Sequence, residues 1–341
     1  MKNLLDSGKA SQFAEESLQM RVYSSQLLGQ NPDLVLHGGG NTSVKLRETN
    51  LFGEEEEILY VKGSGRNLAT IEAEGFTALR LKTLRKLIAL GSISDSEMVR
   101  QQRMAMINPD APSPSVEALL HAIIPFAWTD HTHADAVVTL TNTPQGEELI
   151  REVYGNRLLV IPYVMPGFKL ARKVYELTQG VDWNQYEGMV LLNHGIFSFG
   201  ESARESYERM VDLVSLAEKY LEKNGAVPVS EKAAPEALRA LARIRRAVSR
   251  VRGVAMLAQL NNSPEACGFA NLPNAKAIAA RGPITSDHLI HTKPIPVFLD
   301  PENLGQSIDD FASGYEAYFE RYTNGQQTRL DSAPRWAVWA G

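Results

Sequence analysis

The chain has 341 residues, of which 44% are hydrophobic and 22% charged, and its formal net charge is -5 at neutral pH. This composition provides a sizeable core, and the length predicts one large domain and a smaller unit. The negative charge argues against a nucleic-acid partner, so a bound phosphate would need a few locally placed groups. One cysteine excludes an internal disulfide, and the apolar runs fall short of the roughly 20 residues of a membrane helix. We therefore expect a cytoplasmic protein without a membrane partner.

The first part of the chain is expected to form a helix, two strands and a glycine turn. Apolar residues at three- and four-residue steps predict an amphipathic helix over 11–28. A short apolar segment at 34–36 and alternating residues at 42–46 predict strands on either side of a Gly-rich turn. The acidic run 54–57 is expected to be a solvated hairpin tip before a strand at 58–61.

Helices and strands alternate in the middle of the chain. The segment 116–124 has the spacing of a helix that is capped by a serine. Apolar runs predict strands at 136–140, directly after two histidines, and at 189–192 and 196–199, on either side of a third histidine. This alternation predicts an α/β fold.

The composition changes in the last third of the chain. A long helix is expected over 202–224, with Gly225 at its C-terminal end. The segment 235–253 interleaves arginines with apolar residues, which predicts a basic amphipathic helix. Such a helix could contact RNA or a membrane surface, but a docked helix with an exposed basic face is the favoured interpretation. We predict a domain at 1–228 and a partly helical C-terminal extension at 229–341.

Three histidines form a candidate metal site. His131 and His133 are two residues apart where the chain is expected to enter a strand, so both side chains would point to one face. His194 follows another apolar strand and precedes Gly195, which allows a close backbone approach. Three histidines with an open fourth position are typical of catalytic zinc sites, although such a pair also occurs as ordinary hydrogen-bonded residues. The expected cofactor is Zn²⁺, with another divalent cation as the alternative.

The helix before the histidines carries two further candidates. Glu117 would be a proton carrier near the metal, or else a solvent-facing carboxylate. His121, four residues later on the same helix face, is expected to support the site indirectly or to hydrogen-bond in the core.

Two glycine-rich turns, 38–42 and 62–65, could direct backbone N–H groups at a phosphate, although each could also be an ordinary tight turn. Neither turn matches a nucleotide-binding motif. The candidate phosphate and substrate contacts are Gly40, Asn41, Thr42, Ser64, Gly65 and Ser115.

These segments together resemble the class II aldolase/adducin family. The matching segments are Gly39-Gly40-Asn41-Thr42-Ser43-Val44, Lys62-Gly63-Ser64-Gly65, Pro114-Ser115-x-Glu117, His131-x-His133 and Asn193-His194-Gly195. The chain is similar to the fuculose-phosphate and rhamnulose-phosphate aldolases over residues 11–225, and its tail resembles the middle of longer aldolase/dehydrogenase fusions. No dehydrogenase fingerprint is present, so that second activity is not expected here.

The resemblance implies a three-layer α/β/α domain around a mixed sheet, and a homotetramer with its active sites between subunits. It makes Glu117 the catalytic carboxylate and places Tyr163 in the adjoining subunit's site, although Tyr163 could instead be an ordinary buried tyrosine. The family's serine pair before the glutamate is Ser115-Val116 here, which removes one phosphate hydrogen bond. The metal ligands that carry over are His131, His133 and His194.

The expected activity is zinc-dependent retro-aldol cleavage of a ketose 1-phosphate. The best candidate is L-rhamnulose 1-phosphate, which would give dihydroxyacetone phosphate and L-lactaldehyde. The alternatives are a pentulose-phosphate 4-epimerase, which would use the same bond cleavage, and a non-catalytic adducin-like scaffold.

Overall fold

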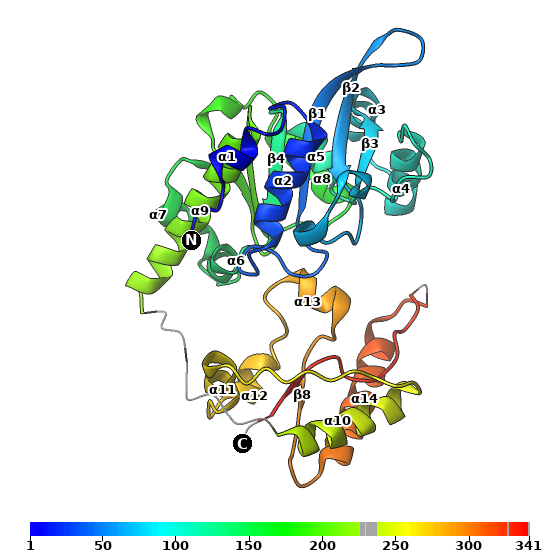
Figure 1. Cartoon of the computed structure of the whole chain (residues 1–341), viewed down its shortest axis with the longest axis vertical. Coiled ribbons are helices and arrows are strands. Elements are labelled where there is room, and N and C mark those ends of the chain that lie inside the picture. Colours follow the sequence, from blue (N-terminus) through cyan, green and yellow to red (C-terminus); the bar gives the residue numbers. More distant parts are fainter. Residues whose placement is uncertain (226–228, 230–236, 326, 340–341) are drawn as a thin grey trace. The chain divides into compact units, whose positions relative to one another are not determined.

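The chain divides into two compact units, 1–225 and 226–341. The computed structural model describes residues 1–225, 229, 237–325 and 327–339 (Figure 1). Among the helices of these described residues, none has the length and apolar character that crossing a membrane requires.

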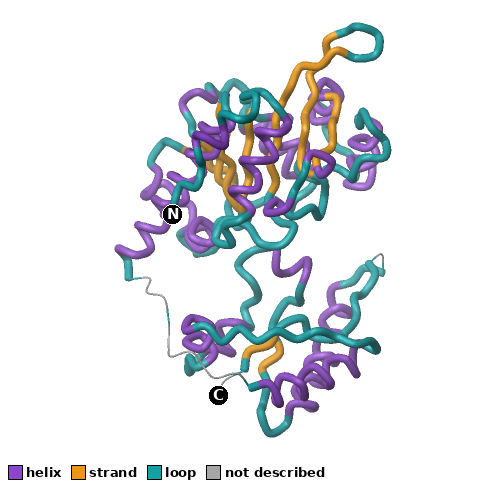
Figure 2. Tube along the Cα trace, viewed as in Figure 1, coloured by secondary structure: helices purple, strands orange, loops and turns teal. Residues whose placement is uncertain are grey.

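A seven-stranded sheet forms the middle layer of the first unit, with the strand order β3-β2-β1-β4-β7-β6-β5 (Figure 2). Neighbouring strands are antiparallel except β5 and β6, which are parallel. The strands are β1 (Asn41–Thr49), β2 (Glu55–Lys62), β3 (Phe76–Arg80), β4 (Trp128–Thr132), β5 (Leu158–Ile161), β6 (Gly188–Leu191) and β7 (Gly195–Gly200). The α/β fold with a mixed sheet is therefore confirmed.

Helices cover both faces of this sheet, which completes the three-layer arrangement. One face is covered by α2 (Leu18–Gly29), α6 (Asp135–Thr141), α7 (Gly146–Tyr154) and α9 (Ala203–Lys223). The other is covered by α3 (Leu81–Ile88), α4 (Asp95–Met104), α5 (Ala118–Ile123) and α8 (Phe168–Leu177). In β7, Ile196 packs in the core of the first face and Phe197 in the core of the second, so alternate residues bury both faces. The unit also has α1 (Ser7–Ala10) and short 3-10 helices at Leu68–Thr70, Ala73–Gly75 and Trp183–Gln185.

Three predicted elements of the first unit differ in the structure. The opening helix begins at Leu18, because the Ser17 side chain accepts from the Met20 N–H and caps the helix there. The segment 34–36 is not a strand. The predicted strand at 136–140 is helix α6.

The error at α6 has a physical cause. Val137, Val138 and Leu140 are all buried between the sheet and neighbouring helices, so the sequence lacks a visible helical period. A short, mostly apolar run cannot be assigned to helix or strand by periodicity. By contrast, the long helix α9 begins after Ser202 and is followed by Gly225 with a φ of 86°, as predicted.

The second unit has a small core of its own. Its elements are α10 (Leu238–Arg252), α11 (Pro264–Ala270), α12 (Ala275–Ala279), α13 (Ser286–His291), α14 (Leu304–Tyr322), and the parallel strands β8 (Val297–Phe298) and β9 (Ala337–Val338). Ile244 of α10 is buried against Val297 and Ile308, whereas Arg243 and Arg246 on the same helix are exposed. The prediction of a docked helix with a basic outer face is confirmed over α10, and the start of the predicted segment at Pro235 lies outside the described residues.

The strand directions bring five chain segments to one edge of the sheet. Because β1 is antiparallel to β2 and β4, its start lies beside their ends. Because β7 is antiparallel to both β4 and β6, the ends of β4, β6 and β5 lie at that same edge. The candidate site residues cluster along it.

Candidate metal centre and active site

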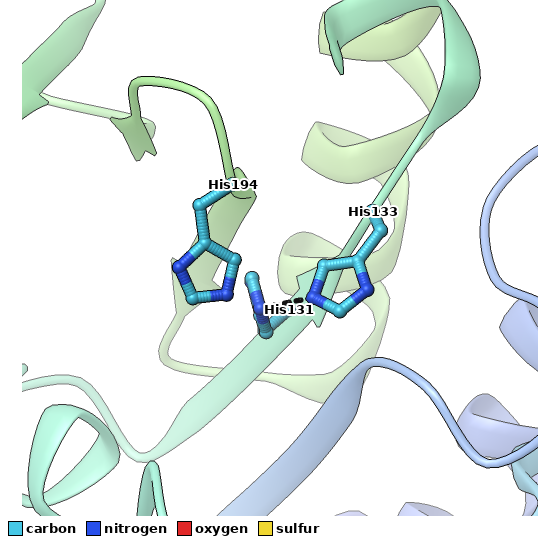
Figure 3. A group of neighbouring side chains, drawn as sticks. All are labelled: His131, His133 and His194. Carbon is cyan, nitrogen blue, oxygen red and sulfur yellow. Dashed lines mark hydrogen bonds between the residues drawn. The ribbon is translucent and has the colours of Figure 1, made fainter. Parts of the chain in front are cut away.

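The three predicted metal-binding histidines converge at this edge. Each offers a ring nitrogen, and these nitrogens all lie within 4.8 Å of one another. The Nε2 atoms of His131 and His133 are 3.1 Å apart, and His194 faces both rings (Figure 3). The His131–His133 pair lies at the end of β4 and not, as predicted, at the entrance to a strand. The convergence is the same because His131 still belongs to a strand and His133 follows it by two residues.

The neighbouring β7 strand holds His131 in one orientation. Its Nδ1 lies 3.0 Å from the Ile196 carbonyl oxygen, and its ring stacks on Phe197 with the ring centroids 4.1 Å apart. Since Nδ1 donates its hydrogen to that carbonyl, the Nε2 lone pair is directed at the other two imidazoles. Burial lowers the pKa of His131 to about 3, so the ring is a neutral ligand at physiological pH.

Gly195 makes the close approach of β7 possible. A Cβ atom at this position would lie 2.4 Å from the Thr132 carbonyl oxygen and 3.0 Å from ring carbons of both His131 and His133. Any other residue would push β7 away from β4 and move His194 with it. The glycine in Asn193-His194-Gly195 therefore maintains the spacing of the triad.

Glu117 lies against the same ring nitrogens. It occupies the N-terminal cap of α5 and is buried. One carboxylate oxygen is 3.0 Å from His194 Nε2, and the other is 3.5 Å from His131 Nε2. Burial raises the pKa of Glu117, but the nearby His131 and His194 lower it by more, so the net pKa lies well below its usual value. The alternative of a solvent-facing carboxylate is wrong.

This donor set fits a divalent cation. The three histidine nitrogens lie on β4, just after β4, and on the turn between β6 and β7, with one carboxylate beside them. Such a set of donors is typical of catalytic zinc centres that keep positions open for substrate. The orienting hydrogen bond from His131 Nδ1 to a backbone carbonyl is typical of metal-ligating histidines. The triad could therefore bind a metal.

Asn41 and Thr42, both expected to contact phosphate, lie on opposite faces of β1. The Asn41 amide nitrogen donates to Glu117 Oε2 at 2.5 Å and to Ser115 Oγ at 3.1 Å. Thr42 is fully buried, and its hydroxyl lies 2.8 Å from that of Ser25 on α2. The structure thus brings Asn41 to the Glu117 carboxylate and directs the Thr42 side chain away from it.

The two glycine-rich turns lie next to each other at the site. Lys62 Nζ donates to the carbonyl oxygens of Gly38 at 2.7 Å and Arg66 at 2.8 Å, which ties the first turn to the second. At Gly40, with a φ of 58°, a Cβ would lie 2.7 Å from the His131 carbonyl oxygen. Glycine is therefore required where the first turn passes β4, the strand that carries His131.

Ser64 and Gly65 are exposed at the tip of the second turn, whereas Ser115 is buried beside it. The Ser64 N–H donates to the Ser113 carbonyl at 2.8 Å, so the second turn also contacts the loop that precedes Glu117. The Ser115 hydroxyl accepts from the Glu117 N–H at 3.2 Å. Ser115 therefore orders the entry to α5.

Tyr163 follows β5 at the same sheet edge. It is 53% exposed, which excludes the alternative of a buried tyrosine. Its hydroxyl is 3.9 Å from the Met165 sulfur, and the structure does not bring it into contact with the histidine triad of its own chain.

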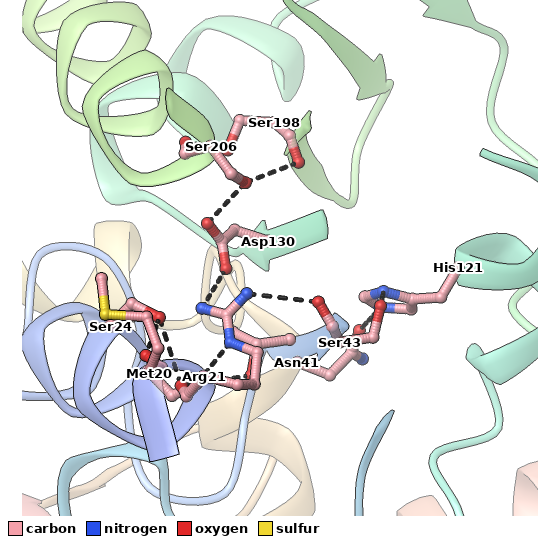
Figure 4. Close-up of polar contacts among 11 residues, drawn as sticks. Met20, Arg21, Ser24, Asn41, Ser43, His121, Asp130, Ser198 and Ser206 are labelled. Carbon is pink, nitrogen blue, oxygen red and sulfur yellow. Dashed lines mark hydrogen bonds and ion pairs between the residues drawn. The ribbon is translucent and has the colours of Figure 1, made fainter. Parts of the chain in front are cut away.

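Sequence reasoning missed a buried ion pair directly behind the triad. Arg21 of α2 and Asp130 of β4 are 2.6 Å apart, and neither side chain has measurable exposure. Asp130 also accepts from Ser206 Oγ of α9 at 2.7 Å, and Arg21 donates to the Ser43 carbonyl oxygen at 3.3 Å (Figure 4). The one signal in the sequence is the acidic residue adjacent to His131, because the partner lies far away in the chain.

Comparisons with known proteins identify both units. Residues 21–221 match the family model described as "Class II Aldolase and Adducin N-terminal domain", and residues 235–341 match "Aldolase class II, second domain". A Bacillus subtilis (strain 168) protein named "Uncharacterized oxidoreductase YuxG" is 34% identical over 360 residues, which cover 98% of this chain and 51% of the relative. The chain therefore spans about half the length of this curated relative.

Solved structures resemble the first unit. The N-terminal class II aldolase domain of a conserved protein from Thermoplasma acidophilum is 39% identical with a TM-score of 0.58, over 65% of this chain and 99% of that one. An L-fuculose 1-phosphate aldolase is 17% identical with a TM-score of 0.43, over 64% of this chain and 91% of that one. The two family models, the first of which covers more than half of the chain, show that this chain belongs to the class II aldolase and adducin family.

Proposed function

We propose that this chain catalyses metal-dependent retro-aldol cleavage of a ketose 1-phosphate, with L-rhamnulose 1-phosphate as the first candidate. The products would be dihydroxyacetone phosphate and L-lactaldehyde. The observation that carries the proposal is the convergence of three histidine ring nitrogens within 4.8 Å of one another, with the Glu117 carboxylate 3.0 Å from His194. A scaffold protein has no need to bury a carboxylate against three histidine side chains.

His131, His133 and His194 would hold the cation, for which zinc is the first candidate. When bound, the cation supplies Lewis-acid stabilisation of the negative charge that develops on substrate oxygen as the carbon–carbon bond breaks. The buried, neutral His131 provides a ligand that needs no deprotonation at physiological pH.

Glu117 is the proton carrier in this proposal. Cleavage of the C3–C4 bond requires the C4 hydroxyl to lose a proton and the C3 carbon to gain one, so the proton count of the reaction balances. The Glu117 carboxylate lies beside the triad and can return the proton to C3. Tyr163, exposed at the sheet edge, would pass the C4 hydroxyl proton to solvent through its own hydroxyl in the site of an adjoining copy, within a homotetramer, and Glu117 would take up a solvent proton before delivering one to C3.

The glycine-rich turns would bind the phosphate. Ser64 and Gly65 are exposed and stand on a turn that Lys62 holds beside the first one. Their backbone N–H groups and the Ser64 hydroxyl are the first candidates for phosphate contacts. Asn41 and Ser115 hydrogen-bond to each other and to the Glu117 residue, so their part in binding would be to align the carboxylate with the anchored substrate.

The test is a panel of ketose phosphates, with release of dihydroxyacetone phosphate coupled to its reduction, before and after treatment with a chelator. We expect turnover of one or more ketose 1-phosphates that is lost with the chelator and restored by zinc. Conversion of L-ribulose 5-phosphate to D-xylulose 5-phosphate without cleavage would identify an epimerase instead. Bound metal with no turnover on any member of the panel would overturn the enzymatic proposal and favour the scaffold.

A further inference from the structure

A continuous line of buried hydrogen bonds leads from β1 through α5 to Glu117 (Figure 4 shows its first part). Ser43 Oγ is 2.8 Å from His121 Nδ1, and His121 Nε2 hydrogen-bonds to Asn41 Oδ1. The Asn41 amide nitrogen then lies 2.5 Å from Glu117 Oε2. Ser43 and His121 are fully buried and Asn41 is 4% exposed, so the network is shielded from water.

The donors in this line can be ordered in only one consistent direction. A carboxylate only accepts, so the amide group of Asn41 must present its nitrogen to Glu117 and its oxygen to His121. His121 Nε2 must then carry the hydrogen, and a neutral imidazole accepts at its other nitrogen. Ser43 is the matching donor to Nδ1.

The direction matters because an amide can rotate by half a turn with little change in shape. If Asn41 were reversed, its carbonyl oxygen would face the Glu117 carboxylate, and two acceptors 2.5 Å apart repel each other. The N–H of His121 makes the reversed orientation unfavourable, because the Asn41 nitrogen would then face a donor. His121 therefore selects the orientation of Asn41.

We infer that His121 and Ser43 are positioning residues that fix the Asn41 amide so that it holds the Glu117 carboxylate in place for proton transfer. This inference rests on the proposed function for its kinetic consequence. His121 does not bind the metal in this arrangement, because Ser43 and Asn41 engage both of its ring nitrogens. Its Phe197 contact, with ring centroids 5.5 Å apart, places it behind the triad.

The first test measures the tautomer and needs no substrate. In protein with ¹⁵N-labelled histidine, we expect His121 to carry its hydrogen on Nε2, with an Nδ1 shift that moves in Ser43→Ala. Ser24→Ala is the matched control, because the buried Ser24 hydroxyl bonds only to the Met20 and Arg21 carbonyls of its own helix. A hydrogen on Nδ1 in the wild-type protein would contradict the proposed order of hydrogen bonds, whatever reaction the chain catalyses.

The second test measures catalysis on the full chain loaded with zinc. We expect His121→Leu to lower kcat by about 10- to 100-fold with little change in KM, as for other residues that orient a reacting group through a neighbour. The exchange of the C3 proton of dihydroxyacetone phosphate with solvent should fall by the same factor, because Glu117 performs that step alone. Metal content should stay at the wild-type level.

Two further variants separate a positioning role of His121 from a structural one. In His121→Gln, the side-chain amide nitrogen can still donate to Asn41, so we expect recovery of most of the lost kcat. Ser43→Ala should lower kcat by a smaller factor, and Ser24→Ala should leave it unchanged. Wild-type kcat in His121→Leu, or a loss of metal that explains the fall in kcat, would overturn the inference. Absence of wild-type turnover would instead refute the proposed function. The tautomer test would then decide whether His121 and Ser43 orient the Asn41 amide.

Discussion

The two faces of strands β1 and β4 both carry buried polar side chains, but the groups are paired differently. On the face toward α2 and α9, Arg21 meets Asp130 at 2.6 Å and Ser206 completes the carboxylate's hydrogen bonds. On the face toward α5, His131 and its two partner histidines surround Glu117. One face matches a fixed positive charge with a negative one, whereas the other brings three histidine ring nitrogens within 4.8 Å of one another.

This difference separates a structural polar cluster from a ligand site. Burial alone does not distinguish the two, because Asp130 and His131 are adjacent and both are fully buried. The distinction is the chemistry of the groups that meet. A complete ion pair adds stability to the fold only as long as both partners remain, whereas ring nitrogens that converge within 4.8 Å beside a carboxylate can also bind a cation.

The largest expected effect is on the face of the sheet that carries the Arg21–Asp130 ion pair. Asp130→Asn would leave the buried Arg21 guanidinium without a countercharge, which costs about 3 to 5 kcal/mol of unfolding free energy. Urea denaturation measures this loss as a change in the unfolding free energy of the first unit. Zinc content of the folded protein should be unchanged. A variant that keeps its stability but loses its zinc would show that Asp130 belongs to the metal site.

The next effect concerns the rate of the proposed cleavage and lies on the face that carries the three histidines. Glu117→Gln would remove the proton carrier but keep the size of the side chain, so we expect cleavage to fall by about 100- to 1000-fold, which is about 3 to 4 kcal/mol of activation free energy. The measurement is kcat at equal zinc occupancy. Unchanged cleavage would assign the proton transfer to another group.

A smaller effect comes from the hydroxyl that supports the ion pair. Ser206→Ala would remove the donor to Asp130 and should cost about 2 kcal/mol of unfolding free energy, because hydrogen bonds to charged groups are stronger than neutral ones. Ser24→Ala, a buried serine bonded only to its own helix's carbonyl oxygens, should cost about 1 kcal/mol or less. Equal losses in the two variants would mean that the charge of Asp130 adds nothing to the bond.

Much of the histidine cluster could be predicted from the sequence because its signals are local. His131 and His133 share a face by their spacing alone, and Gly195 follows His194 where the strands must approach closely. The order of the matching segments then indicated the family and, with it, the role proposed for Glu117. Strands β1, β2, β6 and β7 and the long helix α9 followed from periodicity and capping residues, whereas β3, β4 and β5 were not predicted.

The remaining features depend on packing between distant segments. Asn41 was expected to contact phosphate, but its partners are decided by where α5 places Glu117 and His121. The Arg21–Asp130 pair forms only when α2 lies across β4, which no local pattern indicates. The α6 helix is predicted as a strand because the run 136–140 is short and mostly apolar, which does not distinguish a helix from a strand.

The most direct measurement of the central claim is the metal content of the protein purified without chelators, compared with that of His194→Ala. The three imidazoles predict one divalent cation per chain in the wild-type protein and much less in the variant, with both proteins folded. A wild-type protein that binds no added zinc, or a variant that keeps its full complement, would contradict the account.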